Sequence, residues 1–168
     1  EIFPIVNSQS IGYIQYFAEN HIIPGKITEP MQISPLTIDI IIPVYNGLKY
    51  FDTLFEGIER TKMNYRLILV DDKSPDPMVT KYLDSYAATH DNVILLRNEE
   101  NMGFVRSVNR ALEIAENHVA LVNTDVEVPE EWLERLMDPI IKKPQIATTT
   151  PFTNCGTLCS FPEFAKDN

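Results

Sequence analysis

The feature that most constrains the fold is a repeated alternation of short apolar runs and amphipathic segments between Thr37 and Thr150. The apolar runs are rich in β-branched residues and are bounded by turn residues, which is typical of buried strands. The segments between them carry apolar residues at spacings of three and four, which is typical of helices. We expect five strands, at Ile38–Val44, Leu67–Val70, Val93–Leu96, Val119–Val122 and Ile146–Thr150.

Proline and capping residues predict where two of the helices begin. Asp76 precedes Pro77, and aspartate caps a helix while proline fits its first position. Pro129 is expected to start the last helix in the same way. Short loops between alternating strands and helices require parallel strands, and right-handed crossovers place helices on both faces of the sheet. The predicted fold class is therefore α/β, a Rossmann-like doubly wound and mainly parallel sheet.

The 168 residues suffice for one domain with a core of its own. Prolines and a glycine interrupt any regular pattern between residues 21 and 36, so we expect residues 1–36 to be an N-terminal extension or a linker. Residues 37–168 are expected to form the domain. The stretch Pro151–Asn168 has no clear period, and we expect the domain to be truncated at its C-terminus.

Composition and charge exclude several classes of function. With 24 acidic and 14 basic residues the net charge is −10, which argues against a nucleic-acid partner. The longest apolar runs are far shorter than the roughly 20 residues that a membrane span needs, so we expect no transmembrane segment. Cys155 and Cys159 are too few for a disulfide framework or a structural zinc site. Free thiols in a reducing compartment fit them, and we expect a cytoplasmic location, in solution or at the cytoplasmic face of the membrane.

Ligands of open α/β sheets bind beyond the carboxyl ends of the strands, which directs attention to the polar residues there. Tyr45 follows the first strand, and its ring either stacks on a planar base or is an ordinary loop residue. Asp71 and Asp72 follow the second strand. Their carboxylates either accept hydrogen bonds from a base and a ribose or belong to a solvated turn.

The third and fourth strand ends carry groups suited to a diphosphate and a metal. Gly103 and Arg106 lie at the start of a helix, where anions are favoured. Asn123, Asp125 and Glu127 place oxygen ligands on one short loop, as suits Mg²⁺ or Mn²⁺. A divalent ion would let an acidic protein bind a nucleotide diphosphate. No GxGxxG or GxxxxGK[ST] motif occurs, which disfavours dinucleotide oxidoreductases and P-loop enzymes.

The four strand ends taken in order resemble family 2 glycosyltransferases of the GT-A fold. The matching segments are Ile40–Asn46, Val70–Ser74, Asn98–Phe104 and Asn123–Pro129. The resemblance implies an inverting transfer of a sugar from a nucleotide diphosphate donor, with a UDP-sugar favoured, assisted by Mg²⁺ or Mn²⁺. The acceptor would be a carbohydrate or a lipid-linked molecule.

The resemblance also implies roles for residues that match the family's motifs. Tyr45 would stack on the base and Asp72 would accept a hydrogen bond from its ring N–H. Pro43 would shape this pocket, and Asp71 is a further candidate there. Gly103 and Arg106 would lie near the donor.

Metal binding is implied by the family's DxD motif, whose last acid matches Asp125. The first position of the motif is then Asn123, with Thr124 between them, and both would contribute to nucleotide binding. An alternative register, Asp125-Val126-Glu127, makes Glu127 a second candidate ligand of the metal.

The general base of the family lies in a later segment, and no acid after residue 150 sits in a recognisable base motif. We therefore expect the base beyond Asn168, in further domains of a longer chain, and assign no catalytic residue. Two alternatives remain open. One is a nucleotidyltransferase on a similar sheet, and the other is a module that binds a nucleotide or a partner protein without turnover.

Overall fold

The computed structural model describes residues 36–143 and 145–151. The expectations for the N-terminal extension, for the two cysteines and for the general base fall outside these residues. The chain divides into two compact units, of which Ile33–Leu133 carries all the predicted site residues. The second unit comprises Glu1–Gln32 and Glu134–Asn168. No described helix is long and apolar enough to cross a membrane.

Four strands form one parallel sheet in the order β3-β2-β1-β4. Their bounds are β1 (Thr37–Val44), β2 (Asn64–Asp71), β3 (Val93–Arg97) and β4 (His118–Leu121). In register, Val44 lies opposite Asp71, and Asp71 lies opposite Arg97. The carboxyl ends of the strands therefore meet at one end of the sheet, and the predicted doubly wound class is confirmed.

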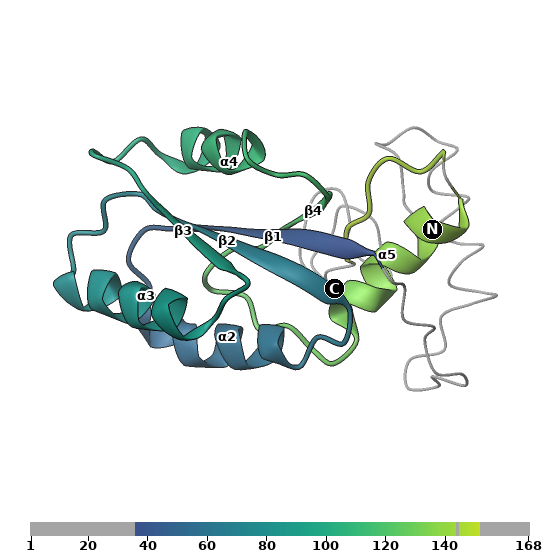
Figure 1. The fold of residues 1–168 in the computed structure, drawn as a ribbon, viewed down its shortest axis with the longest axis horizontal. Coiled ribbons are helices and arrows are strands. Elements are labelled where there is room, and N and C mark those ends of the chain that lie inside the picture. The colour runs from purple at the N-terminus through teal and green to yellow at the C-terminus, as the bar shows by residue number, and fades with distance from the viewer. Residues whose placement is uncertain (1–35, 144, 152–168) are drawn as a thin grey trace, which may run out of the picture. The chain divides into compact units, whose positions relative to one another are not determined.

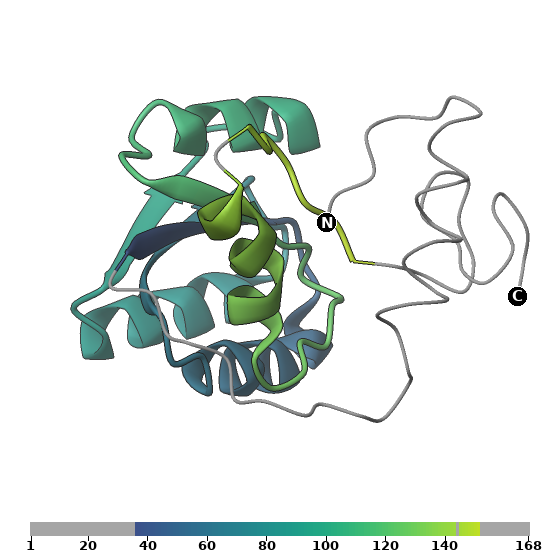
Figure 2. The same cartoon turned by 90° about the vertical axis from the view of Figure 1, so that its right-hand side faces the viewer.

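Helices cover both faces of this sheet (Figures 1 and 2). The 3₁₀ turn η1 (Leu48–Tyr50) leads into α2 (Phe51–Glu59), which lies with α3 (Pro77–Thr89) on one face. Helix α4 (Phe104–Leu112) lies on the other face. After α4 the chain crosses to the far side of β1, so the direction of winding reverses between β1 and β4. Such a reversal is the switch point at which open α/β sheets bind ligands.

The strands have apolar residues on both faces, as a doubly covered parallel sheet requires. Ile41, Ile68, Val70 and Ala111 form a buried cluster between the sheet and α4. Because side chains alternate along a strand, the neighbouring Ile and Leu residues point to the opposite face, where α2 and α3 lie. The fully buried members of this second set are Ile40, Ile42, Leu67 and Leu69.

Strand β2 begins at Asn64, three residues before the predicted Leu67, and two larger differences from the sequence-based expectation concern the last helix and the fifth strand. The last helix, α5 (Trp132–Lys142), begins at Trp132 and not at Pro129. Glu131 has a φ of 59°, a left-handed conformation that a right-handed helix cannot include. Residues 146–150 form no strand. Their β-branched composition favours extended backbone, but a strand needs a hydrogen-bonded neighbour, and no described residue pairs with them.

Gly57 of α2 is buried beneath the loop that follows β4. A Cβ at this position would lie 2.7 Å from Cγ2 of Val128 and 3.1 Å from its carbonyl oxygen. The same loop is held further along by Trp132, whose Nε1 donates a hydrogen bond to Oγ1 of Thr61 at 2.9 Å. Close packing at Gly57 and the hydrogen bond to Thr61 therefore hold the last part of this loop, from Val128 to Trp132.

We predict that Gly57→Ala lowers the free energy of unfolding by about 1–3 kcal/mol, the usual cost of an added methyl in a filled site. Helix propensity alone predicts the opposite sign, since alanine is about 1 kcal/mol better than glycine inside a helix. Urea unfolding measures the difference. Thr53→Ala, at an exposed position of the same helix, is the control and should be neutral or slightly stabilising. A Gly57→Ala variant at least as stable as the wild type would contradict the packing described here.

Candidate functional site

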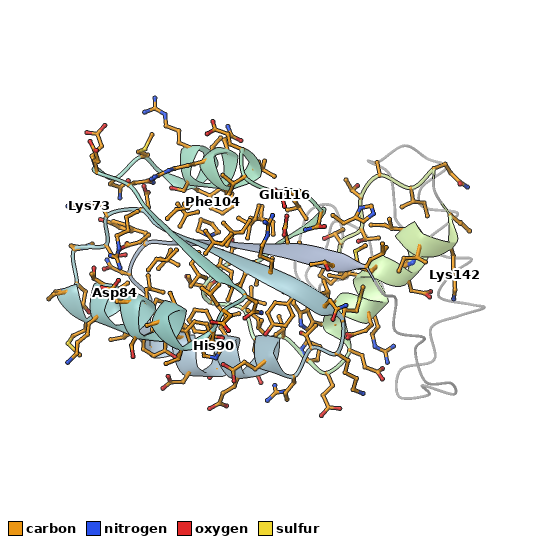
Figure 3. The ribbon with its side chains drawn as sticks, in the orientation of Figure 1. Lys73, Asp84, His90, Phe104, Glu116 and Lys142 are labelled. Carbon is orange, nitrogen blue, oxygen red and sulfur yellow. The ribbon has the colours of Figure 1, made fainter. Side chains whose placement is uncertain are left out.

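Loops from all four strands gather at the carboxyl end of the sheet, which Lys73 and the start of α4 at Phe104 mark in Figure 3. Pairing continues into the loops. Asp72 donates its N–H to the carbonyl of Val44 at 2.8 Å, and Asn98 donates its N–H to the carbonyl of Asp71 at 2.9 Å. The loops after β2 and β3 are therefore each hydrogen-bonded to the last residue of the neighbouring strand.

The loop after β1 turns sharply through two left-handed residues, Asn46 with φ 59° and Gly47 with φ 87°. The N–H of Asn46 donates to Oγ of Ser74 at 3.0 Å, which ties this loop to the one after β2. Tyr45, just before the turn, is 52% exposed. Its ring is therefore available to a ligand, while Pro43 stays half-buried within β1.

Gly47 also allows the loop after β4 to approach the loop after β1 closely. A Cβ on Gly47 would lie 3.3 Å from Oγ1 of Thr124, so the backbone of one loop approaches the side chain of the other. Val122 donates its N–H to the carbonyl of Ile41 at 3.0 Å and extends the pairing of β4 with β1 by one residue. The Asn123–Asp125 segment thus starts at the switch point, beside the loop that carries Tyr45.

Asp71 is buried and closes the loop after β2. Its Oδ1 accepts the N–H of Ser74 at 2.9 Å, and its Oδ2 accepts Nη1 of Arg97 at 3.1 Å. Arg97 also contacts Asp84 of α3, with 2.7 Å between Nη2 and Oδ1. Both oxygens of Asp71 shape the loop, and its contact with a nucleotide stays a prediction.

Asp72 is only 4% exposed, and its carboxylate accepts three hydrogen bonds from the β3–α4 connection. Oδ1 accepts from Nδ2 of Asn98 at 2.7 Å and from the N–H of Met102 at 2.7 Å, and Oδ2 accepts from the N–H of Gly103 at 2.8 Å. Burial by itself raises the pKa of Asp72, but these hydrogen bonds outweigh it and lower the pKa below its ordinary value. The side chain of Ser107 is a further hydrogen-bond donor to this carboxylate and lowers the same pKa.

A second set of buried contacts orients Asp72 and was not anticipated from the motifs. Nδ2 of Asn98 also donates to Oγ of Ser107 at 2.9 Å, and Nη1 of Arg110 donates to Oδ1 of Asn98 at 2.6 Å and to the carbonyl of Arg97. Ser107 is a polar residue on the buried side of α4, four positions before Ala111. That placement is the only signal in the sequence that could have indicated its role.

Gly103 is the N-cap of α4 and has φ 80° and ψ 164°, a combination reached almost only by glycine. No heavy atom lies within 4 Å of the place a Cβ would take, so glycine is needed here for its backbone and not for space. This conformation presents the N–H of Gly103 to Asp72. Arg106 is exposed in the first turn of the helix that follows.

The predicted metal ligands, Asp125 and Glu127, are both exposed on the loop after β4. The described part of the chain contains no group of three or more His, Cys, Asp or Glu side chains that could hold a metal ion by themselves. One or two exposed carboxylates fit Mg²⁺ or Mn²⁺ where a ligand supplies phosphates, since Mg²⁺ usually keeps several waters and takes its other ligands from substrate phosphates.

We predict that Asp72→Asn lowers the free energy of unfolding by about 1.5–3 kcal/mol at neutral pH, the scale of hydrogen bonds to a charged group. Because the pKa of Asp72 lies below its ordinary 3.8 in the folded chain, its stabilisation is complete above that value and is lost as the pH falls through the folded pKa. The gap between wild type and variant should therefore narrow on acidification from about pH 7 to about pH 3.

Urea unfolding at a series of pH values measures this gap. Asp76→Asn is the control, because Asp76 caps α3 by accepting the N–H of Met78 at 2.9 Å and asparagine caps helices equally well. A gap for Asp72→Asn that stays constant over the whole pH range would show that the charge of Asp72 contributes nothing.

Comparison with known proteins places this chain in a family. The sequence model of glycosyl transferase family 2 matches residues 39–158. A dolichol-phosphate mannosyltransferase of Pyrococcus furiosus is 26% identical over 134 residues, which cover 78% of this chain and 38% of the relative. A probable N-acetylgalactosaminyltransferase 8 of Caenorhabditis elegans is 26% identical over 102 residues, which cover 58% of this chain and 24% of the relative.

Solved structures of two glycosyltransferases have a similar fold. TarS of S. aureus in complex with UDP-GlcNAc has a TM-score of 0.56 at 25% identity, covering 64% of this chain and 32% of that one. The mannosyltransferase PcManGT of Pyrobaculum calidifontis, in complex with GDP-Man and Mn²⁺, has a TM-score of 0.62 at 17% identity, covering 82% of this chain and 40% of that one. This chain spans less than half the length of these relatives. Its family match covers most of the domain, and the chain belongs to glycosyltransferase family 2, with the GT-A type of α/β fold.

Proposed function

We propose that this chain supplies the nucleotide-sugar-binding part of an inverting glycosyltransferase that uses a UDP-sugar and Mg²⁺ or Mn²⁺. The observation that carries the proposal is the approach of Gly47 to Thr124, 3.3 Å from a Cβ on the glycine to Oγ1 of the threonine. It joins the loop of Tyr45 to the loop of Asp125 at the switch point of the sheet. Family membership supports the reaction class, and the complex of TarS with UDP-GlcNAc supports the donor.

In this proposal the nucleoside lies over the loops after β1 and β2. Tyr45 offers an exposed ring for stacking on the base, and Pro43 forms the floor beside it. The base N–H donates a hydrogen bond to the carboxylate of Asp72. Asp71 supports the nucleotide pocket indirectly, because its carboxylate holds the loop after β2 by accepting hydrogen bonds from Ser74 and Arg97.

The diphosphate then extends toward the loop after β4 and the start of α4. Asp125 holds the metal, with Glu127 as a second candidate ligand, and Asn123 and Thr124 hydrogen-bond the donor. Across from them, Gly103 opens the N-terminal end of α4, which favours an anion, and Arg106 adds a positive charge. When bound, the divalent ion offsets negative charge on the diphosphate.

The reaction is a single displacement at the anomeric carbon. The acceptor's hydroxyl oxygen forms a bond to that carbon while the bond to the β-phosphate oxygen breaks, which inverts the configuration. A carboxylate elsewhere in the protein takes the hydroxyl proton, and the nucleoside diphosphate leaves. The described residues bind and orient the donor, and the acceptor is a carbohydrate or a lipid-linked molecule.

We predict that UDP binds this chain more tightly with Mn²⁺ than in EDTA, and that Asp125→Ala removes most of the difference. Calorimetry of UDP with and without Mn²⁺ measures it. Glu130→Ala is the matched control, because it removes an exposed acid from the same loop and changes the net charge equally. Wild-type affinity unchanged by EDTA, or equal losses in the two variants, would contradict the role of Asp125.

Stacking on Tyr45 gives a separate prediction. Tyr45→Ala should weaken UDP binding by about 1–3 kcal/mol, the scale of a lost base–aromatic stack, whereas Tyr45→Phe keeps the ring and should bind nearly as the wild type does. Pyrophosphate has no base, so its affinity should be the same for all three proteins. If pyrophosphate binding fell along with UDP binding in Tyr45→Ala, the residue would not belong to the base pocket.

A further inference from the structure

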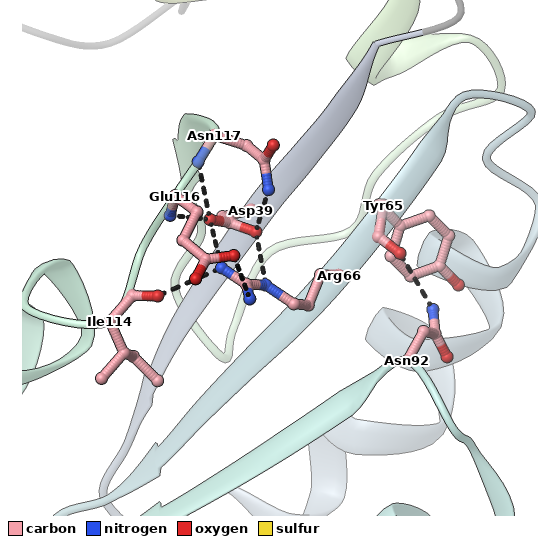
Figure 4. A network of polar contacts seen from close by, with 7 residues as sticks. All are labelled: Asp39, Tyr65, Arg66, Asn92, Ile114, Glu116 and Asn117. Carbon is pink, nitrogen blue, oxygen red and sulfur yellow. Dashed lines mark hydrogen bonds and ion pairs between the residues drawn. The ribbon is translucent and has the colours of Figure 1, made fainter.

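A buried carboxylate lies at the end of the sheet opposite to the candidate site, close to Glu116 and far from Lys73 (Figures 3 and 4). Asp39 of β1 is 0% exposed and forms a two-pronged ion pair with Arg66 of β2. Nε of Arg66 donates to Oδ1 at 2.8 Å, and Nη2 donates to Oδ2 at 2.8 Å. An unpaired charge would be costly in this position. The ion pair with Arg66 therefore explains why an acid is tolerated inside an apolar strand.

The same carboxylate holds the turn that leads from α4 into β4. Its Oδ2 accepts the N–H of Glu116 at 2.8 Å and the N–H of Asn117 at 3.1 Å, and its Oδ1 accepts Nδ2 of Asn117 at 3.1 Å. Arg66 holds the same turn directly, because its Nη2 donates a hydrogen bond to the carbonyl of Ile114 at 3.1 Å. Burial raises the pKa of Asp39, but this set of donors outweighs it and lowers the pKa to about 2.

Within the described sheet β4 pairs only with β1, through the four residues from His118 to Leu121 and the N–H of Val122. Two of its apolar side chains, Val119 and Leu121, are 39% and 47% exposed. Register in a sheet is normally specified by burying one set of side chains, and it is weakly specified where that burial is incomplete.

The paired segment starts next to the carboxylate, since Ile38 lies opposite His118 and Asp39 lies opposite Val119. Holding the two N–H groups just before β4 therefore sets which residue of β4 meets which residue of β1. A shift by one position would move the strand by about 3.3 Å and turn its side chains to the other face. Mg²⁺ requires ligand distances of about 2.0–2.1 Å, so such a shift would take a carboxylate on the following loop out of reach.

We propose that Asp39 is a positioning residue, which fixes the register of β4 against β1 and thereby places Thr124 and Asp125 in the candidate site. Asp39, Arg66, Glu116 and Asn117 form the β4 clamp. The part of this proposal that concerns ligand binding rests on the proposed function. The part that concerns β4 does not.

Two variants and one control test the β4 clamp. Asp39→Asn removes the charge, and Asn117→Ala removes only the side-chain bond to Oδ1, a milder change that serves if the first variant does not fold. Glu116→Gln is the control, because its 76% exposed side chain contributes only the outer contact with Arg66, 3.2 Å from Nη1 to Oε2. Backbone hydrogen exchange is the first measurement, followed at β4 and at the N–H of Val122.

We expect exchange in β4 and at Val122 to accelerate about tenfold or more in Asp39→Asn and by a smaller factor in Asn117→Ala, as for a local opening. Amides of β2 and β3 should keep their wild-type rates, as should every amide of Glu116→Gln. Unchanged exchange in β4, or an equal increase over the whole sheet, would overturn the proposal.

The second measurement separates the metal-dependent part of binding from base recognition. In Asp39→Asn the gain in UDP affinity from Mn²⁺ should fall about tenfold, while uridine, which contacts only the loops after β1 and β2, should bind as it does to the wild type. Equal losses for both ligands would assign Asp39 a general structural role and overturn positioning. A wild-type chain that bound neither ligand would refute the proposed function, while the exchange rates would still decide whether the β4 clamp sets the register.

Discussion

Strand β1 pairs with β2 on one side and with β4 on the other, and these two pairings, with that of β2 and β3, place the loops of the candidate site. The chain winds outward from β1 to β3 and then returns to the far side of β1, which creates the switch point. Because all four strands are parallel, their carboxyl ends meet there, and backbone hydrogen bonds continue from the sheet into the loops. The positions of the site's loops are therefore determined first by the alignment of the strands and only then by single side chains.

Two groups of acidic residues in this domain differ in their surroundings. Asp39, Asp71 and Asp72 are buried, and each is surrounded by donors from the protein itself. A buried charge is stable only when it is paired or hydrogen-bonded, so these carboxylates act mainly on the chain's own backbone. Asp125 and Glu127 are exposed on a loop and keep their oxygens for a ligand. The negative charge of the chain thus serves both structural anchoring and, in the proposed function, metal binding.

Asp72 links the two groups. Three of its protein donors come from the connection between β3 and α4, and one of these donors, Asn98, is held in turn by Ser107 and Arg110. These hydrogen bonds hold the carboxylate of Asp72 in one orientation. Preorganisation of this kind reduces the entropy lost when a ligand is bound. In the proposed function a substitution at Asp72 would act on the loop and on the ligand together, so Tyr45 is the better residue for testing the proposed base pocket.

Local pattern in the sequence determined the strands β1 to β4, the start of α3 at Pro77 and the polar residues that end each strand. These features depend on neighbours within a few positions, and periodicity reports such neighbours directly. Where the same reasoning failed, the structure shows a cause beyond local pattern. Helix α5 begins only after Glu131, because that residue has a left-handed backbone conformation. Residues 146–150 have no pairing partner among the described strands.

Only the tertiary structure decided which distant groups meet. Asp39 contacts Glu116, 77 positions away, and Asp72 contacts Gly103, 31 positions away. The sequence marked Asp39 only as a charge inside an apolar run and gave Ser107 no role at all. Partners of this kind depend on the order of the strands and on their register. A hydrophobic period of two or of 3.6 residues describes one element at a time, so it carries no information about which elements become neighbours.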